Sequence, residues 1–221
     1  MRRLPNAILA FLVLVSPAAV WAGRIQGTVV AIHDGDTIQI DIGGPRPARV
    51  RLAGTDSPEI EVNNKSQGRV AYAARDYLRS RLPIGATITV QTLDGAGESD
   101  KHNRLLGRLF YGNVDLNLEM LKAGWSVLYV IAPYDKTMVR DYAIAAREGF
   151  ESRRGMFSDE YKDTEMPYQF RLRVMRQRGR NLLGDLDTRK LHRQADMEHV
   201  PVYSRIFFPS IESARERGFD Y

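Results

Sequence analysis

The chain contains no cysteine among its 221 residues. It therefore cannot form disulfides, hold zinc through thiolates or carry a lipid on a cysteine. A stable fold must depend on a hydrophobic core instead. The apolar fraction of 43% is enough for one domain of ordinary size with an appendage.

The sequence also lacks an uninterrupted apolar run of about 20 residues, the length that a membrane-spanning helix needs. The chain begins with Met1-Arg2-Arg3, continues with a short apolar run over residues 7–15, and then reaches Val20-Trp21-Ala22. This succession predicts a secretory signal peptide, residues 1–22, cleaved after Ala22. An uncleaved membrane anchor is the alternative. We expect an exported protein, located in the periplasm or outside the cell.

A large excess of positive charge is missing from most of the chain, although the formal net charge is +5. Residues 23–167 carry 19 basic and 20 acidic side chains, whereas residues 168–221 carry 11 and 7. Any attraction to nucleic acid must therefore come from local lysines and arginines or from the C-terminal part. That basic part is either a solvated face or a surface that binds nucleic acid or another anionic partner.

What the sequence does contain is a concentration of acidic side chains between residues 32 and 59. Asp34-Gly35 and Gly43-Gly44-Pro45 are turn sequences, and aliphatic residues alternate with polar ones over residues 37–42. This pattern predicts three antiparallel strands that return Asp36, Arg51 and Asp56 to neighbouring positions.

Carboxylates that converge in this way repel one another unless a cation lies between them. An all-oxygen cluster suits a hard cation such as Ca²⁺. Taken alone, however, Asp-Gly-Asp-Thr over residues 34–37 is also typical of a solvated turn.

Further elements follow along the chain. Apolar spacing predicts helices over residues 66–82, 116–123 and 136–154, and strands over residues 87–93 and 105–111. Ser66 could cap the first helix. Five strands broken by short helices, without a βαβ rhythm, indicate a small α+β barrel, which we place in a domain of residues 23–160.

Residues 161–221 form a basic C-terminal extension whose structure the sequence leaves uncertain. Residues 168–174 alternate between apolar and polar side chains, and a series of arginines follows. Residues 205–208 and 210–217 are typical of a strand and a capped helix. The extension faintly resembles small zinc-binding appendages, but those use cysteines, so we expect no metal there.

Three motifs occur in order: Asp-Gly-Asp-Thr at 34–37, Arg-x5-Ser-Pro-Glu at 51–59, and Asp-Lys-x-x-Arg at 100–104. Together they resemble the staphylococcal nuclease (thermonuclease) family, from about residue 27 to about residue 157. The resemblance implies a five-stranded OB-fold β-barrel with about three packed helices.

The resemblance also implies roles for the matching residues. Asp36 and Asp56 would bind Ca²⁺ directly, together with the backbone carbonyl of Ser57. Glu59 would be the general base or would orient the attacking water. Arg51 and Arg104 would grip the scissile phosphate, because a guanidinium makes two parallel hydrogen bonds to it.

Lys65, Lys101 and Tyr129 would contact the substrate by the same resemblance. The chain departs from the family pattern at His102 and Asn103, where a tyrosine and a glycine are expected, and at Ile131, which replaces a second base-side tyrosine.

The resemblance implies a Ca²⁺-dependent nuclease that cuts DNA and RNA with little sequence preference and leaves 3′-phosphorylated products. We expect a monomer. The main alternative is a noncatalytic OB-fold protein that binds nucleic acid. A third possibility is a structural envelope protein tethered by its basic tail, for which Ca²⁺ would have no effect.

Overall fold

The computed structural model describes residues 23–93, 99–100 and 102–221. The predicted signal peptide and Lys101 lie outside these residues. Within them, no helix is both long enough and apolar enough to cross a membrane.

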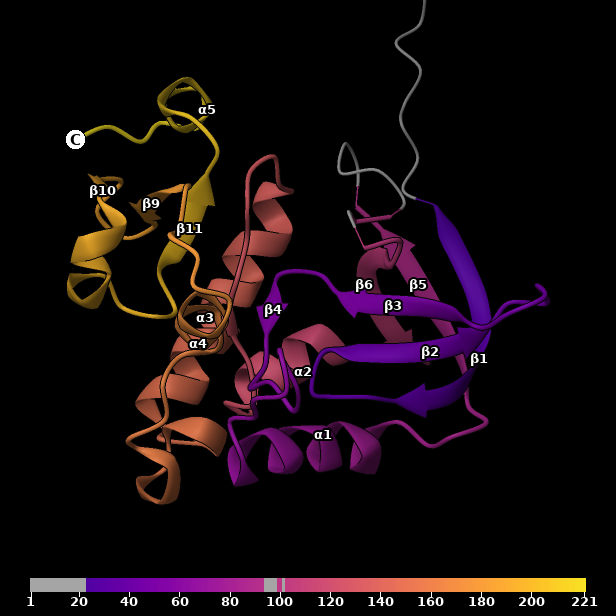
Figure 1. Ribbon diagram of the computed structural model, residues 1–221. Helices are drawn as coiled ribbons and strands as arrows, with labels where there is room; N and C mark the ends of the chain where they lie inside the picture. The colour runs from indigo at the N-terminus through magenta and orange to yellow at the C-terminus, as the bar shows by residue number, and fades with distance from the viewer. Residues whose placement is uncertain (1–22, 94–98, 101) are drawn as a thin grey trace, which may run out of the picture.

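Five strands form a closed barrel, the part drawn in indigo and magenta in Figure 1. Their order is β3-β2-β1-β5-β6, and a parallel pairing of β3 with β6 closes the ring. The strands are β1 (Arg24–Ile32), β2 (Thr37–Asp41), β3 (Ala48–Leu52), β5 (Thr87–Thr92) and β6 (Leu105–Tyr111). A short β7 (Val114–Asp115) pairs with β6. The predicted α+β barrel is confirmed.

The barrel interior includes Ile38 and Ile40 of the alternating stretch, whereas Ile42 at its end is 44% exposed. Ile38, Ile40, Val50 and Leu52 are fully buried in one hydrophobic cluster with Leu109. Successive side chains of a strand point to opposite faces, so the neighbouring polar residues Thr37 and Arg51 point away from this core. They lie opposite each other in the β2–β3 register.

Two helices, α1 (Arg69–Arg81) and α2 (Leu116–Lys122), pack on the barrel, and α3 (Lys136–Glu151) packs against α2 and β8. Asp115 caps α2 by accepting hydrogen bonds from the N–H groups of Asn117 and Leu118, and Asp135 caps α3 by accepting one from Met138. The predicted cap of α1 is wrong. Gly68, with a φ of 74°, precedes this helix, whereas the Ser66 hydroxyl accepts a hydrogen bond from the Gly68 N–H.

A two-stranded sheet lies beside the barrel and joins the second motif to the chain before α3. In it, β4 (Thr55–Asp56) pairs antiparallel with β8 (Val127–Leu128), so Asp56 lies opposite Val127. Figure 1 shows β4 between the barrel and the C-terminal part of the molecule.

The C-terminal extension contains α4 (Pro167–Val174), β9 (Leu182–Asp185), β10 (Leu191–His192), β11 (Arg205–Phe208) and α5 (Ile211–Arg215). The three strands form an antiparallel sheet in the order β10-β9-β11. Short 3₁₀ turns occupy Gly155–Phe157, Asp159–Tyr161 and Gln194–His199. The predicted strand and capped helix near the end are confirmed, with Ser210 as the cap of α5.

The alternation over residues 168–174 does not produce a strand. These residues form α4, which begins with Pro167 at its first turn and buries Pro167 and Phe170 on one side. Proline suits this position, because its fixed φ matches a helix and its missing N–H would be unpaired there anyway. The spacing of 167, 170 and 174 fits one helical face equally well.

The extension is packed tightly onto the rest of the molecule. The Phe207 N–H donates to the Val130 carbonyl at 2.8 Å, and the Ala132 N–H donates to the Phe207 carbonyl at 2.9 Å. Phe208 and Phe219 belong to the same hydrophobic cluster as Tyr142 of α3. The extension therefore shares a core with the helices that support the barrel.

Candidate active site

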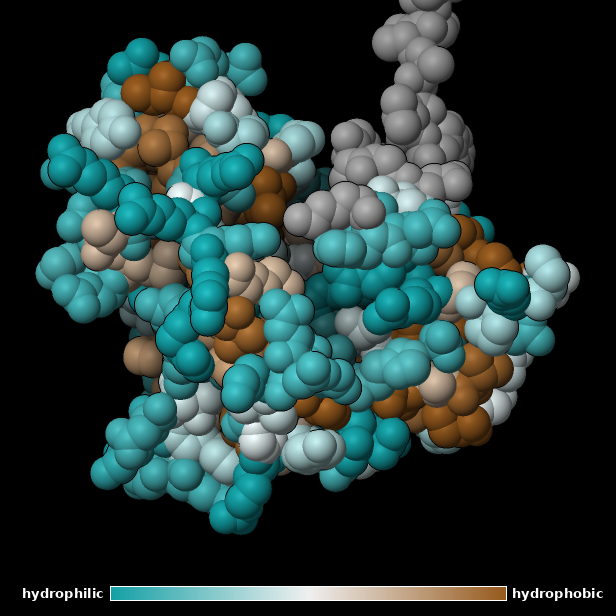
Figure 2. Space-filling view, viewed as in Figure 1, coloured by the Kyte–Doolittle hydropathy of each residue, from teal (hydrophilic) through white to brown (hydrophobic). Residues whose placement is uncertain are grey.

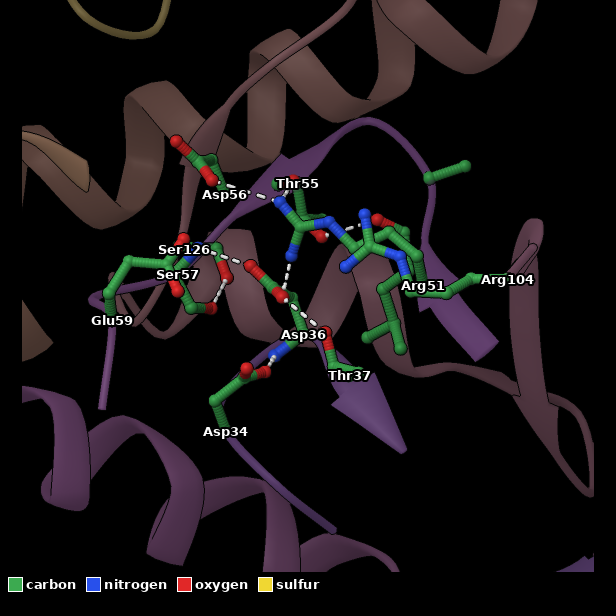
Figure 3. A network of polar contacts seen from close by, with 12 residues as sticks. Asp34, Asp36, Thr37, Arg51, Thr55, Asp56, Ser57, Glu59, Arg104 and Ser126 are labelled. Carbon is green, nitrogen blue, oxygen red and sulfur yellow. Dashed lines mark hydrogen bonds and ion pairs between the residues drawn. The ribbon is translucent and has the colours of Figure 1, made fainter. Parts of the chain in front are cut away.

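The two predicted metal-binding carboxylates lie in buried positions at the end of the barrel strands. Asp36 comes directly before β2 and is 3% exposed, and Asp56 lies in β4 and is 0% exposed. The Ser57 N–H donates to Asp36 Oδ2 at 2.6 Å and so links the two motifs. Figure 3 shows each of these carboxylates in contact with Arg51.

The turn before Asp36 is held tightly against the second motif. A Cβ added to Gly35 would meet the Ser57 side chain at 2.6 Å, so only glycine allows this close approach. The Asp36 N–H donates to Asp34 Oδ1 at 2.9 Å. Burial raises the pKa of Asp34, although Arg51 opposes that change.

Arg51 lies between the two carboxylates, as Figure 3 shows. Its Nη1 forms an ion pair with Asp36, and its Nη2 donates to Asp56 Oδ1 at 2.9 Å and to the Thr55 carbonyl at 3.2 Å. The structure therefore brings together Asp36, Arg51 and Asp56 as the strand pattern predicted. The fork of the guanidinium explains how one side chain can contact both.

Glu59 lies next to Asp56, on the loop that leads to α1. The Glu59 N–H donates to Gln67 Oε1 at 2.9 Å, and the Gln67 N–H donates back to the Glu59 carbonyl at 2.9 Å. Its side chain is 17% exposed. Burial raises the pKa of Glu59, and Arg171 opposes that rise. Glu59 thus keeps access to solvent while its backbone is fixed.

Arg104 lies just before β6, beside β3 through the parallel register that pairs Val50 with Leu105. Its Nε and Nη2 both donate to Asp100 Oδ2, at 2.8 and 2.7 Å. Asp100 Oδ1 accepts from the N–H groups of His102 and Arg104. Burial acts to raise the pKa of Asp100, but these hydrogen bonds lower it overall. Asp100 therefore fixes the side chain of Arg104 beside the site.

The three predicted substrate contacts have different outcomes. Lys65 is exposed in a small hairpin with Val62, and Lys101 lies outside the described residues. Tyr129 is packed between Tyr168 and Phe207 of the extension, with ring centroids 5.4 and 5.2 Å away. Burial raises the pKa of Tyr129 to about 12. Its ring faces are thus largely occupied by side chains of the extension.

Sequence analysis missed one residue of the site, Arg171 on α4. Its Nη2 donates to Asp56 Oδ2 at 2.9 Å, and its Nη1 donates to Glu59 Oε1 at 2.7 Å. Although burial acts in the opposite direction, Asp56 and Glu59 raise the pKa of Arg171. The helix start at Pro167 could be read from the sequence, but it does not distinguish Arg171 from Arg173, which lies on the same helix and is exposed.

A model of the family described as "Staphylococcal nuclease homologue" matches residues 49–159. The chain belongs to this family. The match confirms the predicted family and agrees with its OB-fold α+β architecture. It also includes Arg51, Asp56, Glu59 and Arg104, whereas Arg171 lies beyond it.

Similar proteins include Endonuclease YhcR of Bacillus subtilis, which is 30% identical over 208 residues, or 89% of this chain. An uncharacterized endonuclease of Escherichia coli O157:H7 is 29% identical over 136 residues, covering 61% of this chain and 78% of that protein. An uncharacterized protein of Bacillus anthracis is 28% identical over 134 residues, covering 61% of each.

The chain spans only 17% of the length of the Bacillus subtilis protein and 61% of the Bacillus anthracis protein. Residues 1–160 make up less of the chain than the 89% aligned with Endonuclease YhcR, so that alignment includes part of the C-terminal extension.

The residues of this staphylococcal nuclease homologue fit a hard cation. Within residues 23–93, 99–100 and 102–221, no group of three or more metal-binding side chains occurs. The carboxylates of Asp36 and Asp56 nevertheless converge on one guanidinium, that of Arg51. Two carboxylates leave room for backbone, water and phosphate oxygens, which suits a divalent cation that takes six or more oxygen ligands. The donor chemistry is thus compatible with Ca²⁺.

Proposed function

We propose that this protein is a Ca²⁺-dependent nuclease that hydrolyses phosphodiester bonds of DNA and RNA with little sequence preference. The observation that carries the proposal is the convergence of Asp36, Arg51, Asp56 and Glu59 at one end of the barrel. The family match and the names of two relatives as endonucleases support it. The expected products carry 3′-phosphates.

Arg51 and Arg104 would bind the scissile phosphate. Both side chains are fixed by carboxylates, Arg51 by Asp36 and Asp56 and Arg104 by Asp100. A charged donor that is already oriented stabilises the extra negative charge of the transition state without reorganisation at the moment of reaction. This arrangement favours phosphoryl chemistry over simple binding.

Glu59 would accept a proton from the attacking water, because its carboxylate is partly exposed and stands beside Asp56. Asp36 and Asp56, with the Ser57 carbonyl, would hold the cation. When bound there, a divalent cation supplies positive charge that stabilises negative charge developing on the phosphate. The close approach of Gly35 to Ser57 keeps the turn that carries Asp36 against the segment that carries Asp56.

The test is hydrolysis of single-stranded DNA and of RNA by the purified chain, with Ca²⁺ or with a chelator. We expect cleavage of both polymers with Ca²⁺, none with chelator, and product ends that a 3′-phosphatase converts to hydroxyls. Binding without cleavage under every divalent cation would support the noncatalytic alternative instead.

Export and a monomeric state are further parts of the proposal. The mass of the protein isolated from the cell envelope or medium tests the first, since cleavage after Ala22 would leave a chain that begins at Gly23. Light scattering of the purified protein tests the second.

A further inference from the structure

Arg171 reaches the candidate active site from the C-terminal extension. Its two Nη atoms contact both carboxylate oxygens of Asp56, and Nη1 also contacts Glu59. The side chains of Arg171, Asp56 and Glu59 are 18%, 0% and 17% exposed. Arg171 thus makes a bidentate, charge-assisted contact with Asp56, which the proposed function assigns to the cation. It also contacts Glu59, which the proposed function assigns to the attacking water.

The position of Arg171 is fixed by its surroundings. Its guanidinium lies 5.5 Å from the ring centre of Tyr129, and α4 is anchored by buried Phe170. Gln67, which holds Glu59, also donates to the Glu165 carbonyl just before α4 at 2.7 Å. Contacts from the barrel, the loop and the extension therefore place Arg171 at the site.

A second arginine on the same helix shows what an ordinary surface pair looks like here. Arg173 pairs with Glu165 on its own segment, and its side chain is 63% exposed. An exposed pair of this kind contributes little energy. Arg173 differs from Arg171 in its partner and burial but shares its helix and charge, so it is a matched control.

Figure 2, in the same view as Figure 1, shows hydrophilic residues gathered where the barrel meets the C-terminal part of the molecule. In the site itself, Asp36, Asp56 and Glu59 face two guanidinium groups, those of Arg51 and Arg171. A dication added to these groups leaves an excess of positive charge, which favours a phosphate as the next ligand. Without Arg171, the same dication would come close to neutralising the carboxylates.

Resting on the proposed function, we propose that Arg171 is a positioning residue of the active site that competes with the divalent cation for Asp56. It holds the carboxylates of Asp56 and Glu59 in place, lowers the affinity for the cation and raises the affinity for the substrate phosphate. The C-terminal extension is thereby part of the catalytic unit.

The decisive measurement is Ca²⁺ binding by isothermal titration calorimetry, without nucleic acid, for the wild type, Arg171→Ala, Arg171→Gln and Arg173→Ala. We expect the two Arg171 variants to bind Ca²⁺ about tenfold more tightly, because a unit charge a few ångströms from a dication costs at least that much even when screened. Arg173→Ala should match the wild type. Circular dichroism checks that each variant is folded, and the uncharged, polar glutamine decides the outcome if the alanine variant unfolds.

Kinetics supply a second readout that a purely structural ion pair would not give. At saturating Ca²⁺, KM for a short single-stranded oligonucleotide should rise several-fold in Arg171→Gln, and Arg171→Lys should recover part of the loss because it restores the charge. Arg173→Ala should keep the wild-type KM.

Equal Ca²⁺ affinity in the wild type and in folded Arg171→Gln would overturn the role of Arg171. Failure of the proposed function would look different: the wild type itself would bind no Ca²⁺ or cut no nucleic acid.

Discussion

Asp56 accepts hydrogen bonds from two arginines that reach it from different parts of the chain. Arg51 belongs to the barrel and is five residues away in sequence, whereas Arg171 belongs to the C-terminal extension and is 115 residues away. The first contact follows from a local strand and turn. The second exists only because the extension shares a hydrophobic core with α3. The comparison shows that Asp56 is held both by a residue of the family's barrel and by a residue outside it.

Removing residues 161–221 should have the largest effect of the changes considered, because it removes the Arg171 side of this comparison and lowers the stability of the fold. Ile206, Phe208 and Phe219 are at most 1% exposed and pack in the cluster that contains Tyr142. Burial of such side chains is worth about 1.5–3 kcal/mol each. Their loss approaches the total stability of an ordinary domain, about 5–15 kcal/mol. We expect residues 23–160 alone to lose cooperative thermal unfolding, measured by circular dichroism against residues 23–221.

A truncated protein that unfolds cooperatively and cuts DNA at the wild-type rate would show that the barrel is sufficient. The extension would then be only an attached surface, as its basic composition also allowed.

Much of the barrel side could be predicted from sequence, because its signals are local. The turn at Gly43-Gly44-Pro45 and the alternation over 37–42 set the register of β2 and β3, in which Thr37 lies opposite Arg51. That register is enough to bring Asp36 and Arg51 together. The motif at 51–59 then supplies Asp56 and Glu59 through the short β4.

The extension side could not be predicted in the same way. Arg171 is one of several arginines in a basic stretch, and its sequence neighbours alternate as a strand would. The position of α4 depends on long-range contacts, such as those of β11 with Val130 and Ala132 and of Gln67 with the Glu165 carbonyl. Such long-range packing leaves no periodic signal in a single sequence. Tyr129 illustrates the same limit, since its partners Tyr168 and Phe207 also come from the extension.

Glu59→Gln should have the largest effect on turnover, because Glu59 is the proposed general base. Loss of a general base lowers the rate about 10²–10⁴-fold. The measurement is kcat on single-stranded DNA at saturating Ca²⁺. Glu61→Gln is the matched control, since Glu61 is exposed nearby. A kcat that falls equally in both variants would remove Glu59 from the mechanism.

Arg104→Ala should have the next largest effect and tests the barrel side alone. Loss of one transition-state donor lowers turnover on the order of 10²–10³-fold. The affinity for Ca²⁺ should stay near that of the wild type, because Arg104 pairs with Asp100. Arg108→Ala is the control, since Arg108 of β6 pairs with Asp115 of β7. Wild-type turnover in folded Arg104→Ala would show that Arg104 does not bind the scissile phosphate, contrary to the role assigned from the motif at residues 100–104.

Asp185→Asn should have the smallest effect and tests the extension alone. Burial acts to raise the pKa of Asp185, but hydrogen bonds from Ser204, Thr188 and Asp187 lower it below its ordinary value of 3.8. A lowered pKa in the folded state stabilises the protein above the unfolded pKa, and this contribution disappears as the pH falls through the folded pKa. Thermal unfolding of the variant should therefore depend less on pH below about pH 4. An unchanged pH dependence would show that Asp185 does not contribute.

The most direct test is the rate of single-stranded DNA hydrolysis as a function of Ca²⁺ concentration for the wild type and Asp36→Ala. The variant loses a charged oxygen ligand, so its half-saturating Ca²⁺ concentration should rise, and excess Ca²⁺ should restore part of the rate. The wild type should be inactive with a chelator. Hydrolysis that is independent of Ca²⁺, or the same Ca²⁺ dependence in both proteins, would contradict the assignment of a cation to this carboxylate cluster.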